Sequence, residues 1–438
     1  PQLLQGLEAS ETLSPLPQTG WEETTLMAVV MAQDPSAQVA ALMAVNLALA
    51  GRAAGQVELT GRLDEDLRLA LRRALEERSR SVEADLRDRI ACAIALGRLG
   101  DPRWERREGR TGTYLVPPLV DVPGGTYPIG EDEAITWSFG DAVGRATGHM
   151  PRHRVDVEAF RIGRFPVTNA EWTCFEAAGG YRDLRWWETE DARRWLKGDL
   201  ANEGAMASCR YWRQRFIAEA GLYEQMESEG AFPDEAGRLR WKRWLTLDDD
   251  AFAAEMAERW KGNPVSLPAF WHDPRLNHPS MPVVGVSWFE ARAYCAWLSA
   301  ESGLSLRLPT EVEWEAAARG PGGHAFPWGD DDEPSRANTI RTRIHHSTPV
   351  GVFVEGDSAF GAADCAGNVF EWTLSLWGTF DMEREATAFA YPYQAADGRE
   401  RVEAPSLVAR ILRGGAWSMD ASYARCAYRY HYLPDLRA

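Results

Sequence analysis

Two short stretches near the C-terminus decide the fold: Gly367-Asn368-Val369-Phe370-Glu371-Trp372 and Leu412-Arg413-Gly414-Gly415-Ala416-Trp417. Each places turn-forming residues beside a tryptophan. The adjacent Gly414 and Gly415 allow positive φ angles and a close approach between backbone segments. Asn368 suits a turn because its side chain can hydrogen-bond to nearby backbone groups. The two stretches therefore predict tight turns next to aromatic side chains.

Five further motifs precede these stretches, at residues 122–130, 153–169, 282–295, 307–315 and 326–329. Together the seven motifs, in this order, resemble the formylglycine-generating-enzyme family, whose fold is a variant of the C-type lectin fold. The resemblance covers residues 114–438 and implies an α+β domain of that type. It is specific for the fold and leaves the activity open, because one fold serves many functions.

Local patterns within this domain predict its elements. Runs of β-branched and aromatic residues between turn residues predict strands at 114–122, 125–129, 154–157, 160–162 and 283–286. Capping residues predict helices over 169–178, after Thr168, and over 288–302, between Ser287 and Gly303. Residues 181–281 form a long insertion with eight tryptophans, for which we expect a packed set of helices. Residues 379–408 form a second, more polar insertion.

The first 110 residues differ from the rest of the chain. Residues 22–54 are rich in Ala, Leu, Met and Val, and residues 63–78 and 82–99 alternate apolar with charged faces at helical spacing. Val82, Leu86 and Ile90 are expected on one apolar face, and Gly100-Asp101-Pro102 ends the last helix. The pattern predicts an α-helical region over 1–110 that is HEAT-like, most clearly at residues 95–102. Helical pairs that only pack and bind nothing are the alternative.

Composition limits the function classes. The chain has 438 residues and a net charge of −17, which disfavours nucleic acid as a partner. No apolar stretch is long enough to predict a membrane span, and no signal peptide is recognisable. Six scattered cysteines without a CxxC pair favour free thiols in a reducing compartment, so a cytoplasmic, bacterial-type protein is expected. Of the 19 tryptophans, 17 lie beyond residue 110 and predict a large aromatic core.

Charged residues in two of the motifs suggest structural roles. Around Trp314, residues 307–315 carry one arginine and three glutamates, a pattern that predicts buried ion pairs around a turn. Relatives of the resembled family bind structural calcium near the motif that holds Asn368 and Glu371. These two residues are therefore candidate calcium ligands, although Asn368 has an alternative role as the cap of its turn. No other cofactor is expected.

The resemblance makes two enzymatic interpretations available. In formylglycine-generating enzymes, two active-site cysteines bind copper shortly after the Arg-Gly-Gly motif. The comparable residues 416–424 contain no cysteine, and Cys426 is the only thiol nearby. Since Cu(I) favours thiolate ligands, one cysteine is too few for that site.

The second enzymatic interpretation is a non-haem iron sulfoxide synthase of the ergothioneine type. Those enzymes use a three-histidine site supplied by an N-terminal helical domain. Residues 1–110 contain no histidine, Pro151 separates His149 from His153, and the adjacent His345 and His346 diverge. These residues disfavour both metal sites. A metal-dependent oxidase of either type is kept as the alternative to a non-catalytic protein.

The C-terminal segment favours a binding function. Fixed-looking residues alternate there with clusters whose members can all arise from an Asn codon by changing its two adenines. The predicted variable residues are Ser418, Asp420, Ser422, Tyr423, Tyr430, His431, Tyr432, Leu433 and Leu436. This pattern resembles the variable region of diversity-generating retroelement target proteins, which display mutated side chains on a C-type lectin fold. Met419 cannot arise in this way and must be a fixed position, and the Gly-Phe-Arg strand that usually closes the fold is absent from this sequence. An ordinary lectin-like domain with a solvated loop remains the alternative.

The residues in this set have the chemistry of a paratope. Tyrosines offer rigid amphipathic contact area at a low cost in entropy, and Ser, Asp and His offer adaptable hydrogen bonds. Trp417, Arg425 and Arg429 are expected to hold the segment in place. The expected partner is a macromolecule, most plausibly a protein, that is recognised through a few aromatic side chains.

Helical repeats followed by this fold also resemble the C-terminal part of large bacterial sensor proteins that carry an NTPase. No GxxxxGK[ST] motif occurs in the sequence, so an NTPase would have to precede Pro1. We therefore consider that the chain is a part of such a sensor.

Overall fold

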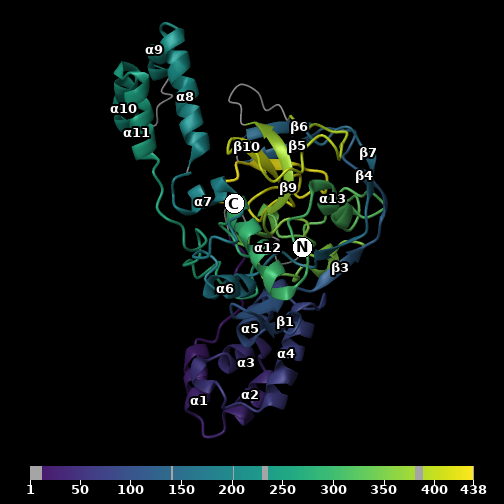
Figure 1. Ribbon diagram of the computed structural model, residues 1–438. Coiled ribbons are helices and arrows are strands. Elements are labelled where there is room, and N and C mark those ends of the chain that lie inside the picture. Colours follow the sequence, from purple (N-terminus) through teal and green to yellow (C-terminus); the bar gives the residue numbers. More distant parts are fainter. Residues whose placement is uncertain (1–11, 140–141, 201, 229–234, 380–387, 438) are drawn as a thin grey trace.

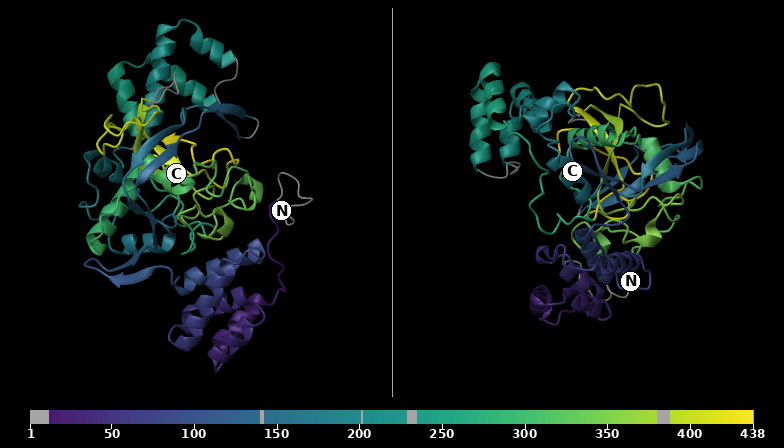
Figure 2. Two further views of the ribbon diagram at one scale, coloured as in Figure 1. Left: turned by 90° about the vertical axis from the view of Figure 1, so that its right-hand side faces the viewer. Right: turned by 60° about the horizontal axis from the view of Figure 1, so that its bottom comes forward.

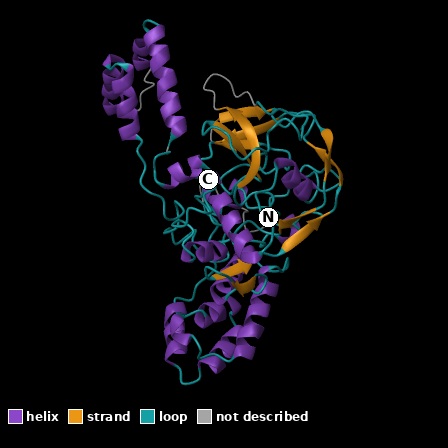
Figure 3. Ribbon diagram, viewed as in Figure 1, coloured by secondary structure: helices purple, strands orange, loops and turns teal. Residues whose placement is uncertain are grey.

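The computed structural model describes residues 12–139, 142–200, 202–228, 235–379 and 388–437. A helical region at the N-terminus and a helical bundle from the first insertion lie at opposite ends of a central α+β domain (Figures 1 and 2). Figure 3 shows that loops make up much of the central domain, with short strands between them.

The N-terminal region is helical, as the sequence predicts. Its helices are α1 (Glu22–Met31), α2 (Pro35–Met43), α3 (Leu47–Ala54), α4 (Glu65–Ser79) and α5 (Leu86–Leu99), with a short 3₁₀ turn η2 at Val57–Leu59. The Asp34 and Asn46 side chains cap α2 and α3, which explains why the continuous apolar stretch forms separate helices. Leu71, Leu75 and Leu96 are fully buried in the shared core. Whether these helices are of the HEAT type stays a prediction.

The prediction that Val82 lies on the apolar face of the last helix is wrong. Helix α5 begins at Leu86, so Val82 lies in the preceding turn and is 54% exposed. The Asp85 side chain accepts a hydrogen bond from the backbone N–H of Arg87 and thereby fixes the start of the helix after Val82.

The helical region packs tightly onto the central domain. The Ser280 hydroxyl donates a hydrogen bond of 2.8 Å to the carbonyl of Ala93. Gly97 fits against the same serine so closely that an added Cβ would lie 2.7 Å from the Ser280 nitrogen. Arg89 donates to the carbonyl of Val352 at 2.8 Å. The two parts therefore share a specific, hydrogen-bonded interface.

The central domain begins with antiparallel pairs of strands. They are β1 (Glu105–Glu108) with β2 (Thr113–Val116), β3 (Leu119–Val122) with β8 (Phe160–Gly163), β4 (Gly125–Ile129) with β7 (His153–Val157), and β5 (Ile135–Phe139) with β6 (Ala142–Ala146). The strand predicted over 114–122 is split into β2 and β3 at Pro117 and Pro118, because proline cannot donate a ladder hydrogen bond. The strands predicted at 125–129, 154–157 and 160–162 are confirmed.

A three-stranded antiparallel sheet lies beside the C-terminus. Its order is β11 (Tyr430–Tyr432), β10 (Val408–Arg413) and β9 (Glu371–Thr379), so the wholly buried β10 is in the middle. The helices of the domain are α6 (Asn169–Ala177), α12 (Trp288–Ser302) and α13 (Glu311–Arg319), with 3₁₀ turns η3 (Ile340–Thr342) and η4 (Val354–Gly356). All three helices begin with a capping box, the first two at the predicted caps Thr168 and Ser287. The predicted α+β class of the C-type lectin-like type is confirmed.

The strand predicted over 283–286 is not formed. Gly285 has a φ of +70°, which turns the chain, and the neighbouring contact is only an isolated bridge between Thr168 and Pro282. The run of β-branched residues predicted a strand here, but the residues instead bury Val286 where the chain enters α12.

The first insertion carries its own helices, as expected. They are α7 (Glu190–Leu196), α8 (Glu203–Ala218), α9 (Leu222–Ser228), α10 (Glu235–Thr246) and α11 (Asp249–Arg259). Helices α8 to α11 project from the domain as a bundle in Figure 1, with Met206, Trp244, Phe252 and Met256 in its small core. In the second insertion, residues 388–407 form neither helix nor strand.

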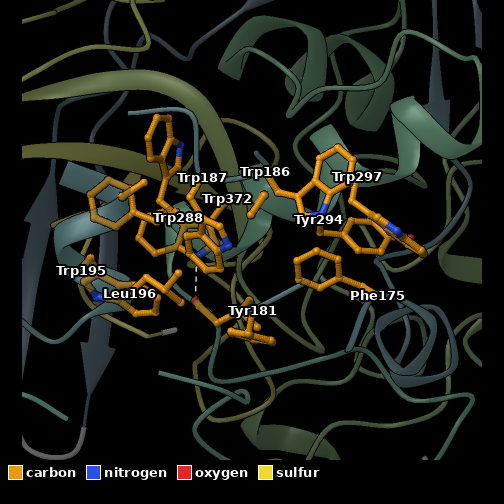
Figure 4. Packing of buried hydrophobic residues seen from close by; sticks show 14 of the residues in the cluster. Phe175, Tyr181, Trp186, Trp187, Trp195, Leu196, Trp288, Tyr294, Trp297 and Trp372 are labelled. Carbon is orange, nitrogen blue, oxygen red and sulfur yellow. Dashed lines mark hydrogen bonds between the residues drawn. The ribbon is translucent and has the colours of Figure 1, made fainter. Parts of the chain in front are cut away.

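Tryptophans from the first insertion join the central core. Trp187 and Trp195 stack on each other, and Trp195 packs against Phe289 of α12. Figure 4 shows this cluster around Trp288, Trp297 and Trp372. The high tryptophan content therefore supplies a core that fastens the insertion to the domain, as well as the separate core of the bundle. Within the described residues, the structure contains no helix that is both long and apolar enough to cross a membrane.

Candidate functional site

The two stretches that decide the fold lie against each other. The backbone N–H of Gly367 donates to the carbonyl of Gly414 at 2.7 Å, and that of Trp417 donates to the carbonyl of Asn368 at 3.0 Å. Gly414 and Gly415 have φ angles of +92° and +73°, as the sequence predicts for this turn. The candidate site begins at this turn, which leads into residues 416–437. We call these residues the C-terminal segment.

Buried ion pairs hold this C-terminal segment just before its start and within it. Glu315 of α13 accepts hydrogen bonds from Arg413 at 2.5 Å and from Arg319 at 2.8 Å. Glu311, one turn earlier, accepts two from Arg429, at 2.7 and 3.0 Å. Both carboxylates are fully buried. Burial raises the pKa of Glu315, but Arg413 and Arg319 outweigh it, so the net shift is downward. Buried ion pairs predicted for 307–315 are thus present at Glu311 and Glu315, with arginines from outside that stretch. Arg307, the arginine of the stretch, pairs with Glu313 with a side chain that is 55% exposed.

The third expected support, Arg425, reaches a different element. Its guanidinium donates to Glu131 at 2.7 Å and lies 5.7 Å from the ring of Phe326. Beside it is a cleft of about 550 Å³, whose lining includes Ser422 and Asp132. Arg425 and Arg429 thus anchor the segment at two separate points.

Asp420 joins the segment to the β5–β6 hairpin. One of its carboxylate oxygens accepts hydrogen bonds from the backbone N–H and hydroxyl of Ser138, at 2.7 and 2.6 Å. The other accepts from the N–H and hydroxyl of Ser422. Burial raises the pKa of Asp420, but these hydrogen bonds outweigh it and lower the pKa. Asp420 therefore acts as a structural tie in addition to any contact it makes with a ligand.

Aromatic side chains gather along this face. We call Trp137, Phe370, Tyr423, Tyr430 and Tyr432 the aromatic patch. The rings of Phe370 and Tyr430 stack with centroids 4.8 Å apart, and Tyr432 meets Tyr430 edge-on at 5.2 Å. Trp137 of β5 lies 6.0 Å from Tyr423. All members except Tyr423 keep part of their surface exposed, so the patch combines a packed base with accessible ring area.

Two of the nine predicted contact residues are buried in this chain. Tyr423 is 5% exposed, beneath Trp137 and against Tyr428. Leu433 is 3% exposed and packs with Trp377 and Ile411. The prediction that these two side chains are displayed is wrong, because the hairpin and the sheet cover them. Ser418, Ser422, Tyr430 and Tyr432 are partly exposed, and Leu436 is 37% exposed.

His431 lies on the other face of the sheet from the neighbouring tyrosines. Side chains alternate along a strand, so Tyr430 and Tyr432 share one face of β11 and His431 points to the opposite one. There its ring stacks on Trp377 at 4.4 Å between centroids. Burial and, to a smaller extent, the nearby Arg429 lower the pKa of His431 to about 4. His431 is therefore separated from the aromatic patch.

This lowered pKa makes a pH prediction. We expect His431 to stay neutral until the pH falls to about 4. Its pKa is about 6.5 in an unfolded chain, so its contribution to stability is complete above pH 6.5 and is lost as the pH falls through 4. NMR titration of the imidazole, with the urea-unfolded protein as control, measures this. Titration near the unfolded value in the native protein would contradict it.

The sequence analysis did not identify Trp137, Ser138 or Phe370 as site residues. Trp137 and Ser138 lie in a run of alternating character over 135–139, a signal that could have predicted the strand. Its position beside residue 420 depends on a contact between residues 282 positions apart, which no local pattern specifies. Phe370 lies within one of the fold motifs, and the motif does not indicate whether its side chain lies in the core or at the surface.

The two candidate calcium ligands differ in availability. Asn368 is buried with a φ of +64°, and its side-chain oxygen accepts from the Thr348 N–H at 2.8 Å and from Asn338 at 3.2 Å. It acts as the turn cap, so its assignment as a ligand is not supported. One oxygen of Glu371 is buried without a hydrogen-bond partner. Burial and the Asp364 carboxyl together raise the pKa of Glu371 to about 8, although the Trp314 side chain acts in the opposite direction. The Glu371 oxygen is thus without a protein partner, whereas the Asn368 oxygen is occupied.

The thiols and imidazoles near the site do not fit the copper and iron centres considered above. Cys426 is fully buried, and burial raises the pKa of its thiol to about 12, so the thiolate form is disfavoured. His149 bonds the carbonyl of Glu133, and His153 bonds the carbonyl of Pro151 and the N–H of Tyr393. Across the described ranges, no group of three or more His, Cys, Asp or Glu side chains is arranged to hold a metal ion.

Comparison with known proteins gives several relatives. Hercynine oxygenase of Mycolicibacterium smegmatis is 30% identical over 340 residues, which are 75% of this chain and 60% of that protein. Formylglycine-generating enzyme of Bos taurus is 27% identical over 73% of this chain and 72% of its own length. The chain thus spans less than two thirds of the hercynine oxygenase that it matches.

Among solved structures, variable protein 1 of Treponema denticola is similar over 77% of this chain and 96% of its own, with 16% identity and a TM-score of 0.37. A likeness at this TM-score is too weak to support a functional conclusion. The family comparison is more decisive. The model of the sulfatase-modifying factor enzyme 1-like domain matches residues 108–438. Because this match spans most of the sequence, the chain belongs to the family of proteins with a sulfatase-modifying factor enzyme 1-like domain.

Proposed function

We propose that this protein is a non-catalytic ligand-binding member of its family. It recognises a macromolecule through the partly exposed rings of the aromatic patch, which exclude the buried Tyr423, and through the neighbouring Ser418 and Ser422. The observation that carries the proposal is the construction of this face. Partly exposed rings and hydroxyls lie on a segment that fully buried ion pairs fix just before its start, through Arg413 and Glu315, and within it, through Arg429 and Glu311. Rigid support of this kind lowers the entropy lost on binding.

The chemistry of the patch favours a protein as the partner. Tyr430, Tyr432 and Trp137 offer large amphipathic surfaces of the type that dominate protein interfaces. The serines beside them can adapt their hydrogen bonds to different partners. The net charge of −17 disfavours nucleic acid. The same proposal includes a cytoplasmic location. It also includes a role as the recognition part of a larger sensor, in which helices α1 to α5 form a HEAT-like connection.

The coding DNA tests whether the segment is diversified. A retroelement target should have a nearby template copy with AAC or AAT at the codons that correspond to the proposed variable residues, including Tyr430 and Tyr432. The codons for Met419 and Arg425 should be identical in the two copies, which provides an internal control. Codons in the variable set that cannot derive from Asn codons would contradict diversification.

Substitution of the tyrosines tests whether the patch is dispensable for folding, as a binding surface should be, or is part of the core. We expect the change of Tyr430 and Tyr432 to serine to lower the free energy of unfolding by only about 1 kcal/mol per site, because both side chains are partly exposed. Chemical denaturation measures this. The matched control is Tyr428→Ser, a buried tyrosine of the same segment, for which the loss should be clearly larger. Equal, large losses at all three positions would show that the patch is only part of the core.

Metal-dependent oxidation is the second candidate, and the names of the relatives favour it. It predicts oxygen consumption with a cysteine peptide and copper, or with hercynine, a thiol and Fe(II). Oxygen uptake by the purified protein, compared with the same protein after heat denaturation, decides between the two functions. Turnover above this control, together with stoichiometric bound copper or iron, would contradict the non-catalytic proposal.

Structural calcium is proposed at Glu371. The unpartnered oxygen of Glu371 and the nearby Asp364, whose pKa burial raises to about 7, form a buried pair of acids that a cation would stabilise. At a concentration of about 100 times its Kd, calcium should raise the free energy of unfolding by about 2.7 kcal/mol, and the melting temperature should rise with it. Thermal unfolding of Glu371→Gln should lose this response, and the exposed control Glu158→Gln should keep it. An unchanged response in Glu371→Gln would exclude this site.

A further inference from the structure

A large cavity lies where the N-terminal helices meet the central domain, remote in the sequence from the C-terminal face. Its volume is about 740 Å³, and its walls come from the end of α5, the β1–β2 hairpin and α6. Cavities of this size are typical of small-molecule sites. Neither the fold motifs nor the proposed binding face makes use of it.

The cavity exists because one face of α6 has only small side chains. Ala170, Thr173, Cys174, Ala177 and Ala178 all line it, at the spacing of successive helical turns. Leu99 and Trp104 contribute further apolar wall. The space is therefore lined largely by apolar surface and can hold an apolar molecular body.

The charged side chains of the cavity are mostly arginines. Arg72, Arg98 and Arg106 line it, and within the described residues none of the three forms an ion pair. Asp101, the acid in the lining, is already engaged by Arg103 in a hydrogen bond of 2.5 Å. The cavity therefore carries a local excess of positive charge, although the chain as a whole has a net charge of −17.

The hydrogen bonds of these arginines leave donors available. Arg72 uses its Nε to donate to the carbonyl of Leu99 at 2.9 Å, and Arg106 donates one terminal nitrogen to the Thr113 hydroxyl at 3.2 Å. The pKa of Arg98 is lowered, first by burial and then by the neighbouring Arg52. Arg98 is exposed at the rim of the cavity, and no acid among the described residues forms an ion pair with it, so an anion in the cavity would supply a partner.

We propose that this cavity binds a small organic anion, with its phosphate, carboxylate or sulfonate group on Arg98 and Arg106 and its apolar body against α6. Guanidinium groups suit such anions because their planar donors match two oxygens at once. The wall of small side chains selects for a flat or compact body in place of a bare inorganic ion.

Fluorescence titration with anilinonaphthalene sulfonate tests this on the full chain, because the dye combines a flat apolar body with one sulfonate. We expect saturable binding that weakens at least about tenfold in Arg98→Glu/Arg106→Glu, since each reversal replaces an attraction with a repulsion. The control is Arg73→Glu, an exposed residue of α4 outside the cavity lining, which should leave the affinity unchanged. The neutral analogue N-phenylnaphthylamine should bind more weakly and respond to none of the reversals.

A second variant addresses the shape of the cavity without changing charge. Ala177→Trp places a large ring in the cavity from an exposed position on α6, where it should not disturb the core. It should weaken dye binding by a similar factor at an unchanged melting temperature. Absence of saturable binding, or binding indifferent to both Ala177→Trp and the double reversal, would overturn the proposal.

Discussion

Replacing Arg413 with alanine is expected to lower the free energy of unfolding by about 3–5 kcal/mol. The Arg413 guanidinium is fully buried and donates to Glu315 and to the carbonyl of Cys426, both at 2.5 Å. It also lies 5.3 Å from the ring of Trp314. Its removal leaves one buried carboxylate with less compensation and one buried carbonyl without its donor, and each loss is costly where water cannot enter.

Urea unfolding followed by tryptophan fluorescence measures this loss. The control is Arg307→Ala, which breaks a bidentate pair with Glu313 of the same helix, but with an arginine side chain that is 55% exposed. Solvent screening limits that change to about 1 kcal/mol or less. If Arg413→Ala does not fold, Arg413→Lys keeps the charge and should fold with a smaller loss. Equal effects of Arg413→Ala and Arg307→Ala would refute the role assigned to the buried pair.

Replacing Gly415 with alanine is expected to be nearly as damaging, at about 2–4 kcal/mol. Two costs combine. The φ of +73° is unfavourable for any residue with a side chain. In addition, the new Cβ would lie 2.9 Å from the backbone nitrogen of Ala424, and backbone cannot move aside as a flexible side chain would. The turn that directs the C-terminal segment should therefore be distorted, and exposure of the aromatic patch should change with it.

Gly303→Ala separates the two costs. Gly303 ends α12 with the same φ of +73°, but an added Cβ there has open space around it. Its replacement should cost only the conformational part, about 1 kcal/mol. The difference in unfolding free energy between the two variants measures the steric part, and a difference near zero would contradict the close packing of Gly415 on Ala424.

Elements that depend only on neighbouring residues could be predicted from the sequence. Thr168 and Ser287 cap α6 and α12 as predicted, since a cap needs only its own turn. The adjacent glycines predicted the turn before Trp417, and the ordered motifs predicted the family that the match over residues 108–438 shows. The strand expected over 283–286 did not form, because a short run of β-branched residues is also compatible with a bent, buried connection.

Only the tertiary structure decided which residues of the C-terminal segment reach the surface. Tyr423 and Leu433 have the residue types of a contact surface, yet the β5–β6 hairpin and Trp377 cover them. Asn368 has the chemistry of a calcium ligand, yet the Thr348 backbone already occupies its oxygen. These outcomes depend on segments far apart in the sequence. Burial and hydrogen-bond saturation arise when such segments pack together, so residue type and local spacing cannot specify them.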